Sequence, residues 1–354
     1  MPKHFIVTRL GLCVYSEHWF ESSIDLFEAI TLPSLVRQSS TEFIWLIVID
    51  AEIPPKARDR LERLLSSHPN FHLVPIDVTQ LLHVRQGCFD WVWDHCQDFI
   101  LECGLLDDPY DYIITSLIDA DDAWHQDVIS TINRFMSERL PHACIGEESR
   151  GTWLRHTSGI AATLPCGYTW FVNADALARL QFPFMSMAVF VAARFSSAIS
   201  ACSSRHRSWP SYCDVLAFEV AEVEPDRPMW IYTRHHLTTQ PWDAGTAAPR
   251  GPSSRDILCQ DFGIDPQRVQ QWREKHDQRV GSDDSLMVHR GRDASAQYDR
   301  VFKIAALNRQ IKALKHRREM PGETLVGRDA SLEDMIARSQ VRRELLIGTL
   351  RAHR

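Results

Sequence analysis

The chain has 354 residues, of which 44% are hydrophobic and 24% charged, and its formal net charge at pH 7 is -7. This composition predicts a sizeable folded core rather than a disordered chain. It also argues against general affinity for nucleic acid, because proteins that bind nucleic acid usually carry a clustered positive surplus. The nine cysteines include no CxxC pair, so we expect reduced, mostly buried thiols and no zinc site.

No signal peptide with a cleavage site is recognisable at the N-terminus, where an apolar run begins at Phe5. The longest apolar patch, Phe182 to Ala193, is shorter than the about 20 residues that a membrane-spanning helix needs. We therefore expect a soluble cytoplasmic protein.

The N-terminal third of the chain alternates short apolar runs with amphipathic stretches. Strands are predicted at Phe5–Thr8, Phe43–Ile49, Phe71–Ile76 and Tyr112–Ile118. Helices are predicted between them at Trp19–Val36, Pro54–Leu65 and Val84–Cys103. Such alternation indicates an α/β fold with a Rossmann-like, mainly parallel sheet. Ligands of these sheets bind beyond the carboxyl ends of the strands.

The pattern is looser in the rest of the chain. We expect a helix at Ile129–Arg139, a strand at Tyr168–Val172, a short helix at Ala174–Leu180 and a strand at Met229–Tyr232. Ala, Gly, Pro and Ser are frequent from Asp243 to Ser254, which predicts a linker. Further helices are predicted around Pro266–His276, Tyr298–Arg318 and Leu332–Leu350. The chain is thus divided into a domain at 1–242, with halves at 1–125 and 126–242, and a mostly helical extension at 243–354.

An acidic cluster, Asp119-Ala120-Asp121-Asp122, follows the predicted strand Tyr112–Ile118. Asp119 and Asp121 are two residues apart, so on an extended segment both carboxylates can face one ion. Oxygen ligands suit Mg²⁺ or Mn²⁺, which also bind substrate phosphates. Close carboxylates repel each other unless a cation or hydrogen-bond donors offset them. The alternative is that Asp121 or Asp122 caps a following helix.

Three stretches carry a resemblance to a known family: HFIVTRLG, LFEAITLPSLVRQSSTEFIWLIVIDAEIP and YIITSLIDADDAW. The sequence resembles the putative rhamnosyltransferase family of bacterial GT-A-like glycosyltransferases, over roughly residues 4–130, with a weaker echo in LPCGYTWF and MWIYTRHH. This resemblance implies a GT-A-like mixed sheet and a nucleotide-sugar donor bound by the N-terminal half. The family typically has Arg before the Leu-Asp of its acidic motif, where this chain has Ser116. Arg85 is a candidate to replace that basic contact.

The resemblance also implies roles for residues at the predicted strand ends. Thr8, Arg9 and Asp50 become candidates to contact the nucleobase and ribose, whereas the alternatives are a surface charge for Arg9 and a turn residue for Asp50. In GT-A enzymes a late histidine often completes the metal site, and either His235 or His236 resembles that feature. Neighbouring residues of an extended chain point to opposite sides, so only one of them is expected to face the ion.

An inverting transfer needs a general base near the acceptor hydroxyl. Asp214 is the candidate, with Glu147 and Glu148 as competitors that spacing does not separate from it. The segment Pro165–Trp170 could form a loop that stacks on an acceptor sugar, or its aromatic residues could belong to the core.

The predicted helix within Arg300–Arg318 is basic and amphipathic. It could lie on an anionic membrane surface, as would suit an enzyme with a lipid-linked or glycan acceptor, or it could pack on the catalytic domain. Two further functions stay open. One is a haloacid-dehalogenase-like phosphohydrolase with Asp119 as nucleophile, and the other is a non-catalytic protein that binds nucleotides or glycans.

Overall fold

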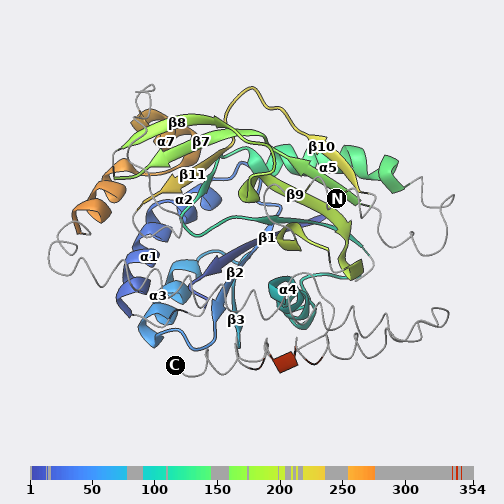
Figure 1. The fold of residues 1–354 in the computed structure, drawn as a ribbon, viewed down its shortest axis with the longest axis horizontal. Helices are drawn as coiled ribbons and strands as arrows, with labels where there is room; N and C mark the ends of the chain where they lie inside the picture. Colours follow the sequence, from blue (N-terminus) through green and yellow to red (C-terminus); the bar gives the residue numbers. More distant parts are fainter. Residues whose placement is uncertain are drawn as a thin grey trace.

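The computed structural model describes residues 2–12, 14, 17–77, 91–108, 111–144, 159–173, 175–197, 199–203, 209, 213, 218–235 and 254–275, and single positions at 337, 340, 341 and 344. Two sheets organise these residues, with helices packed around them (Figure 1).

The larger sheet has seven strands in the order β10-β6-β9-β4-β1-β2-β3. Their bounds are β1 Lys3–Leu10, β2 Ile44–Asp50, β3 Phe71–Ile76, β4 Tyr112–Leu117, β6 Gly159–Thr163, β9 Val189–Arg194 and β10 Glu219–Glu222. Strands β3, β2, β1 and β4 run parallel, whereas β9 is antiparallel to both β4 and β6. The predicted α/β fold with a mixed, mainly parallel sheet is thereby confirmed.

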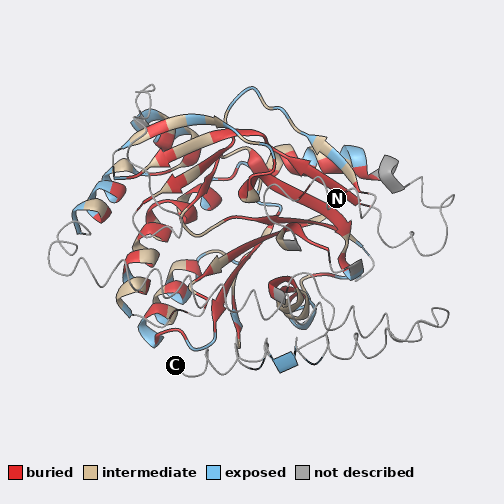
Figure 2. Cartoon of the chain, in the orientation of Figure 1, coloured by how far each residue is buried: buried red, intermediate tan, exposed pale blue. Residues whose placement is uncertain are grey.

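Strands β1 and β2 are buried on both faces, which explains their continuous apolar runs (Figure 2). One face, which includes Ile6 and Ile47, packs in a cluster with residues of α1, α2, α3 and α5. The other face, which includes Val7 and Leu46, packs against α4. The helix bounds are α1 Glu17–Ala29, α2 Thr31–Val36, α3 Pro55–Leu65, α4 Trp91–Glu102 and α5 Val128–Cys144. Both faces of the sheet are thus covered by helices, so the loops at its strand ends start from a packed framework.

The helix predicted at Trp19–Val36 is divided into α1 and α2 at Ile30, whose φ of -120° and ψ of -65° leave the helical region. Pro33 is the physical cause, because a proline inside a helix lacks the N–H for an i−4 hydrogen bond and its ring clashes with the carbonyl of residue i−4. The break lets α2 pack its buried residues Leu32 and Leu35 into the main core.

The smaller sheet has the order β5-β11-β7-β8, with β5 Ala123–Trp124, β7 Cys166–Phe171, β8 Ala176–Gln181 and β11 Trp230–Arg234. The helix predicted at Ala174–Leu180 is wrong, because this segment is strand β8, paired antiparallel to β7 from Phe171↔Ala176 to Cys166↔Gln181. Its Ala and Leu residues favour helix, but the pairing partner overrides that preference.

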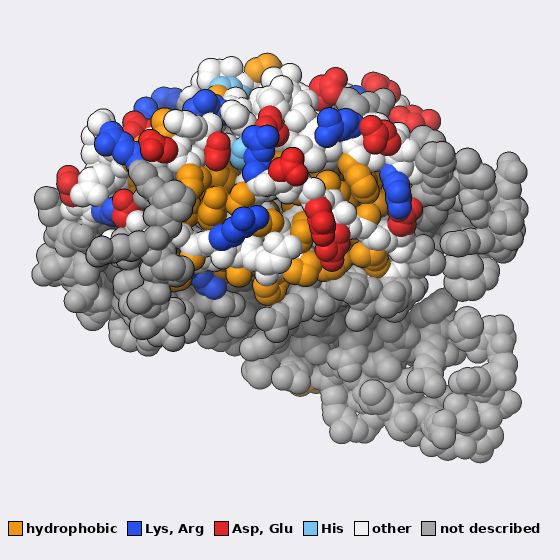
Figure 3. Space-filling model, turned by 90° about the horizontal axis from the view of Figure 1, so that it is seen from above, with side chains coloured by type: hydrophobic (Ala, Val, Ile, Leu, Met, Phe, Trp, Pro, Cys, Tyr) orange, Lys and Arg blue, Asp and Glu red, His pale blue; other side chains and the backbone are white. Residues whose placement is uncertain are grey.

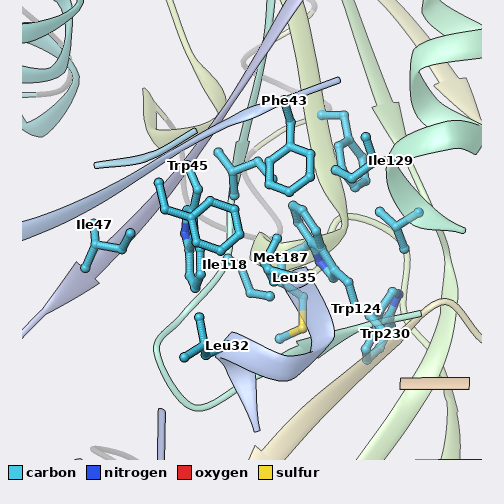
Figure 4. Packing of buried hydrophobic residues seen from close by; sticks show 14 of the residues in the cluster. Leu32, Leu35, Phe43, Trp45, Ile47, Ile118, Trp124, Ile129, Met187 and Trp230 are labelled. Atoms are coloured by element: carbon cyan, nitrogen blue, oxygen red, sulfur yellow. The ribbon is translucent and has the colours of Figure 1, made fainter. Parts of the chain in front are cut away.

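Three tryptophans, one from the large sheet and two from the small sheet, belong to the same buried hydrophobic cluster (Figure 4). Trp45 donates its indole N–H to Thr8 Oγ1 at 2.9 Å, Trp124 to the carbonyl of Met187 at 2.8 Å and Trp230 to the carbonyl of Leu164 at 2.7 Å. Each large apolar ring is therefore buried with its indole N–H hydrogen-bonded.

Two helices of the predicted C-terminal extension belong to the same folded unit. Helix α7 spans Ser254–Phe262 and a second helix spans 266–275. Phe262, Val269 and Trp272 join a buried cluster with Leu26 of α1 and Ile231 of β11. The domain boundary predicted at 242 is therefore corrected, since the packed core reaches at least residue 275. The basic stretch Arg300–Arg318 lies outside the described residues.

Figure 3 shows one face of the molecule, on which acidic and basic side chains are interspersed around hydrophobic ones. Among the described residues, no helix combines the length and apolar content needed to cross a bilayer.

Candidate active site

The acidic cluster connects the two sheets at the carboxyl end of β4. Ile118 still donates its N–H to the carbonyl of Val7 at 3.0 Å, and the backbone then turns, with the Asp122 N–H donating to the Asp119 carbonyl at 3.2 Å. Strand β5 follows at once and pairs antiparallel with β11. The cluster thus lies at the strand-end edge where ligands of parallel sheets bind, as predicted.

Arg9, at the end of β1, lies beside the first carboxylate of the cluster. Its Nη2 is 3.5 Å from Asp119 Oδ1, and both side chains are partly exposed. Because β1 and β4 are parallel neighbours, with Val7 opposite Leu117, their ends bring these two residues together. A basic side chain at the acidic motif is therefore supplied by β1.

Asp121 meets a histidine from the far end of the domain. Its Oδ2 lies 2.8 Å from His235 Nε2, and His235, which directly follows β11, is buried. Of the two late histidines predicted as a metal ligand, His235 therefore lies at the acidic cluster, and its role as a ligand stays a prediction; His236 lies outside the described residues. Asp119 and Asp121 thus contact different partners.

Asp122 is buried and fastens the cluster to β11. Its Oδ1 accepts a 2.9 Å hydrogen bond from the Thr233 N–H, while the Thr233 hydroxyl donates to the Asp121 carbonyl at 2.8 Å. Its other oxygen, Oδ2, has no hydrogen-bond partner among the described residues. Burial, together with the carboxylates of Asp121 and Asp119, raises the pKa of Asp122 well above its usual value. A strand follows Asp122, so the helix-cap interpretation is wrong for this residue.

Arg234 and Tyr232 complete the described surroundings, and sequence reasoning missed both. The Arg234 Cζ lies 4.3 Å from the centroid of the Tyr232 ring, and the two residues share a face of β11 because they are two positions apart. The Arg234 Nη1 is buried and has no hydrogen-bond partner among the described residues. Burial raises the pKa of Tyr232 to about 12, so its hydroxyl stays protonated. The stretch MWIYTRHH, which contains β11, was the available signal.

Thr8 and Asp50 are enclosed rather than open to a ligand. Thr8 is fully buried and its hydroxyl accepts the Trp45 indole N–H. Asp50 is also fully buried, and its Oδ1 accepts the N–H of Glu52 at 3.0 Å, as a turn residue would. Both side chains are enclosed in this conformation, and a contact of either one with a donor stays a prediction.

Ser116 lies in the core. Its Oγ is 2.9 Å from His4 Nε2, and both residues are buried beneath α5. The departure from the family pattern at this position therefore changes a buried polar contact. Arg85, Asp214, Glu147 and Glu148 lie outside the described residues. Pro165–Trp170 is largely strand β7 rather than an acceptor loop, and Trp170 is fully buried.

The predicted ligand set of Asp119, Asp121 and His235 does not form a closed metal site. Among the described residues, no group of three or more His, Cys, Asp or Glu side chains is arranged to hold an ion. What the geometry provides is a pair, Asp121 and His235, of two side-chain types that bind divalent metals. Such an open pair fits an ion that takes its other ligands from water and substrate phosphates.

The chain is similar to one known family and to several solved structures. The model of a family described as putative rhamnosyl transferase matches residues 9–241. Similar solved structures include S. aureus TarS 1–349, at 10% identity and a TM-score of 0.34, covering 65% of this chain and 60% of that chain. The same fragment in complex with UDP is 9% identical with a TM-score of 0.35, covering 99% and 92%.

A putative nucleotide-diphospho-sugar transferase from Desulfovibrio desulfuricans G20 is 10% identical, with a TM-score of 0.34, covering 77% of this chain and 99% of that one. A search of curated proteins gave no significant match. In the comparison with TarS 1–349 without UDP, this chain spans 60%, less than two thirds, of the TarS fragment. Because the family match extends over more than half of its 354 residues, this chain belongs to the putative rhamnosyl transferase family of glycosyltransferases.

Proposed function

We propose that the protein transfers a sugar from a nucleoside-diphosphate donor to a hydroxyl group of a glycan or lipid-linked acceptor, with the help of Mn²⁺ or Mg²⁺. The observation that carries this proposal is the 2.8 Å contact between Asp121 and His235, which are 114 residues apart and meet at the ligand-binding edge of the sheet. The family description makes rhamnose the first donor sugar to test.

Asp121 and His235 would hold the divalent ion, together with water and the donor's phosphate oxygens. When bound, the ion would neutralise charge that develops on the departing diphosphate. The buried Asp122 would keep the loop in place through the hydrogen bond that its Oδ1 accepts from the Thr233 N–H.

Arg9 and Arg234 would bind the anionic part of the donor. Arg9 is partly exposed beside Asp119, and Arg234 keeps a buried N–H that no described residue satisfies. An unsatisfied buried donor is costly, and a phosphate oxygen is a strong acceptor for a guanidinium. Tyr232 holds the Arg234 side chain by its ring face, which preorganises the guanidinium for such a contact.

In the transfer itself, the acceptor hydroxyl oxygen forms a bond to the anomeric carbon while the bond from that carbon to the diphosphate oxygen breaks. The diphosphate leaves with the electron pair, and the hydroxyl proton passes to a general base. Asp214 stays the predicted base, and a cytoplasmic site of action with membrane contact through Arg300–Arg318 stays a proposal of the sequence.

The test is donor binding and turnover by the full chain. A panel of nucleoside-diphosphate sugars, including rhamnose donors, is assayed for hydrolysis and for thermal shift, with and without Mn²⁺. We expect at least one donor to bind and to be hydrolysed only with the ion. Asp121→Asn should reduce this activity by about a hundredfold or more, given the effect of losing a metal ligand or its support. Asp107→Asn, whose carboxylate is highly exposed and pairs with Lys3, is the matched control.

Other outcomes would favour the other functions. A donor that binds without any turnover on an acceptor or water would indicate a non-catalytic binding protein. Hydrolysis of an aryl phosphate that Asp119→Asn abolishes would indicate a phosphohydrolase. If no donor shifts the unfolding temperature with or without Mn²⁺, the proposal is wrong.

A further inference from the structure

His235 is held from two sides. Its Nε2 faces Asp121 Oδ2 at 2.8 Å, and its ring makes an edge contact with Trp272, at 5.7 Å between centroids and 83° between planes. Both His235 and Trp272 are buried, at 3% and 4% exposure. In this T-shaped arrangement the Trp272 ring restricts the plane of the imidazole, and therefore the direction of Nε2.

Trp272 is itself fixed to the body of the domain. Its indole N–H donates to the carbonyl of Ser22 in α1 at 3.1 Å. Helix 266–275, which carries it, lies beside α1 (Figure 1) and is anchored there by Lys275, whose Nζ is 2.6 Å from Asp25 and 3.1 Å from Glu21. The position of Trp272 therefore depends on the packing of the whole helix.

The adjacent residue Arg273 ties the same helix to the small sheet. Its Nη2 is 3.1 Å from Asp175 Oδ1, in the turn between β7 and β8. Helix 266–275 thus contacts both α1 and the turn between β7 and β8 of the small sheet, to which β11 also belongs. It lies beyond residue 241, where the family match ends.

We propose that Trp272 is a positioning residue for His235, so that a helix outside the family-matched segment is part of the construction of the active site. The inference rests on the proposed function in one respect, which is that His235 binds the divalent ion. Trp272 acts by limiting the orientations of the imidazole, so that Nε2 is already directed toward Asp121 when the ion arrives.

The experiment compares Trp272→Leu and Trp272→Phe with Arg268→Ala in the full chain. Leucine keeps apolar bulk without a ring, whereas phenylalanine keeps the ring and loses the hydrogen bond to Ser22. Arg268 is on the same helix, and the one ion pair it makes with a described residue is long and exposed, at 3.7 Å from Glu28. Titration with Mn²⁺ alone should give a dissociation constant about tenfold higher in Trp272→Leu, within about threefold of wild type in Trp272→Phe, and unchanged in Arg268→Ala.

A second readout needs no metal. The ring nitrogens of His235, assigned by the loss of their NMR signals in His235→Ala, should show one tautomer in the wild-type protein and in Arg268→Ala. They should average between tautomers in Trp272→Leu. If the Leu variant does not fold, Trp272→Met gives the same comparison.

Unchanged His235 signals and unchanged Mn²⁺ affinity in a folded Trp272→Leu variant would overturn the inference. Failure of the proposed metal site looks different, since His235→Ala would then leave Mn²⁺ binding and donor hydrolysis unaffected. In that case the NMR comparison alone would still decide whether Trp272 positions the ring.

Discussion

Lowering the pH from 7 to 5 should destabilise the fold through one buried histidine on β1. His4 places Nδ1 2.8 Å from Asn133 Oδ1 and Nε2 2.9 Å from Ser116 Oγ. A neutral ring satisfies both contacts if Nδ1 carries the proton and Nε2 accepts from the serine hydroxyl. Protonation would place a charge in the core, so burial lowers the pKa of His4 to about 4 from its ordinary 6.5.

The sign and size follow from proton linkage. Between pH 4 and 6.5 the unfolded chain binds a proton at His4 that the native state excludes, so stability rises with pH across this window and falls as the pH drops. The loss from this site is about 2 kcal/mol at pH 5 and about 3 kcal/mol once the pH is below 4. Against a typical total stability of about 5–15 kcal/mol, this is a large share.

The assay is urea unfolding of the wild-type protein and of His4→Gln at several pH values. Glutamine can hydrogen-bond but does not titrate, so the other histidines cancel when the two free energies of unfolding are subtracted. We expect the advantage of His4 over Gln to shrink by about 2 kcal/mol from pH 7 to pH 5. A difference that stays constant over that range would refute the reasoning, as would a direct NMR titration of His4 with a pKa near 6.5.

Three further outcomes are expected. Ser116→Arg, which introduces the family's typical residue, should lower the free energy of unfolding by about 3 kcal/mol or more without improving donor affinity, because the position is buried. Gly167→Ala should cost about 1–3 kcal/mol in urea unfolding, since a methyl group there would overlap the indole of Trp230. Arg9→Ala should raise the KM for the donor about tenfold, because it removes the cation beside Asp119; an unchanged KM would exclude Arg9 from the donor site.

The central strands could be predicted from the sequence because burial on both faces leaves a plain signal. Strand β3 has the predicted bounds, β2 is shifted by one residue at both ends, and β4 ends one residue earlier than predicted. The acidic cluster and Arg9 were placed correctly at one sheet edge for the same reason, since parallel strands end together.

Pairings between distant segments could not be predicted in this way. Strand β8 was read as a helix because its composition favours helix, and only its alignment with β7 makes it a strand. The apolar patch ending at Ala193 was noted but not assigned to β9, whose two antiparallel partners are far away in the sequence. Local propensity carries no information about such partners.

The candidate site shows the same limit at the level of side chains. Strand ends located Thr8 and Asp50, but only packing shows that both are enclosed. Asp122 and Thr233 are 111 residues apart, so no local pattern could pair them. The stacking of Arg234 on Tyr232 likewise depends on which face of β11 turns inward.

The hydrogen bond from the Thr233 N–H to Asp122 has a consequence for how the protein is made. During synthesis, β4 and the cluster Asp119–Asp122 leave the ribosome long before β11 exists, so the neighbouring carboxylates lack both this donor and His235. Their mutual repulsion favours an open loop at that stage. The site can close only after the strand carrying Thr233 has been translated. The contact between Trp272 and His235 can form only later still, after helix 266–275 has been translated. A ribosome-bound chain halted before residue 230 should therefore contain the central parallel strands but no ordered acidic loop.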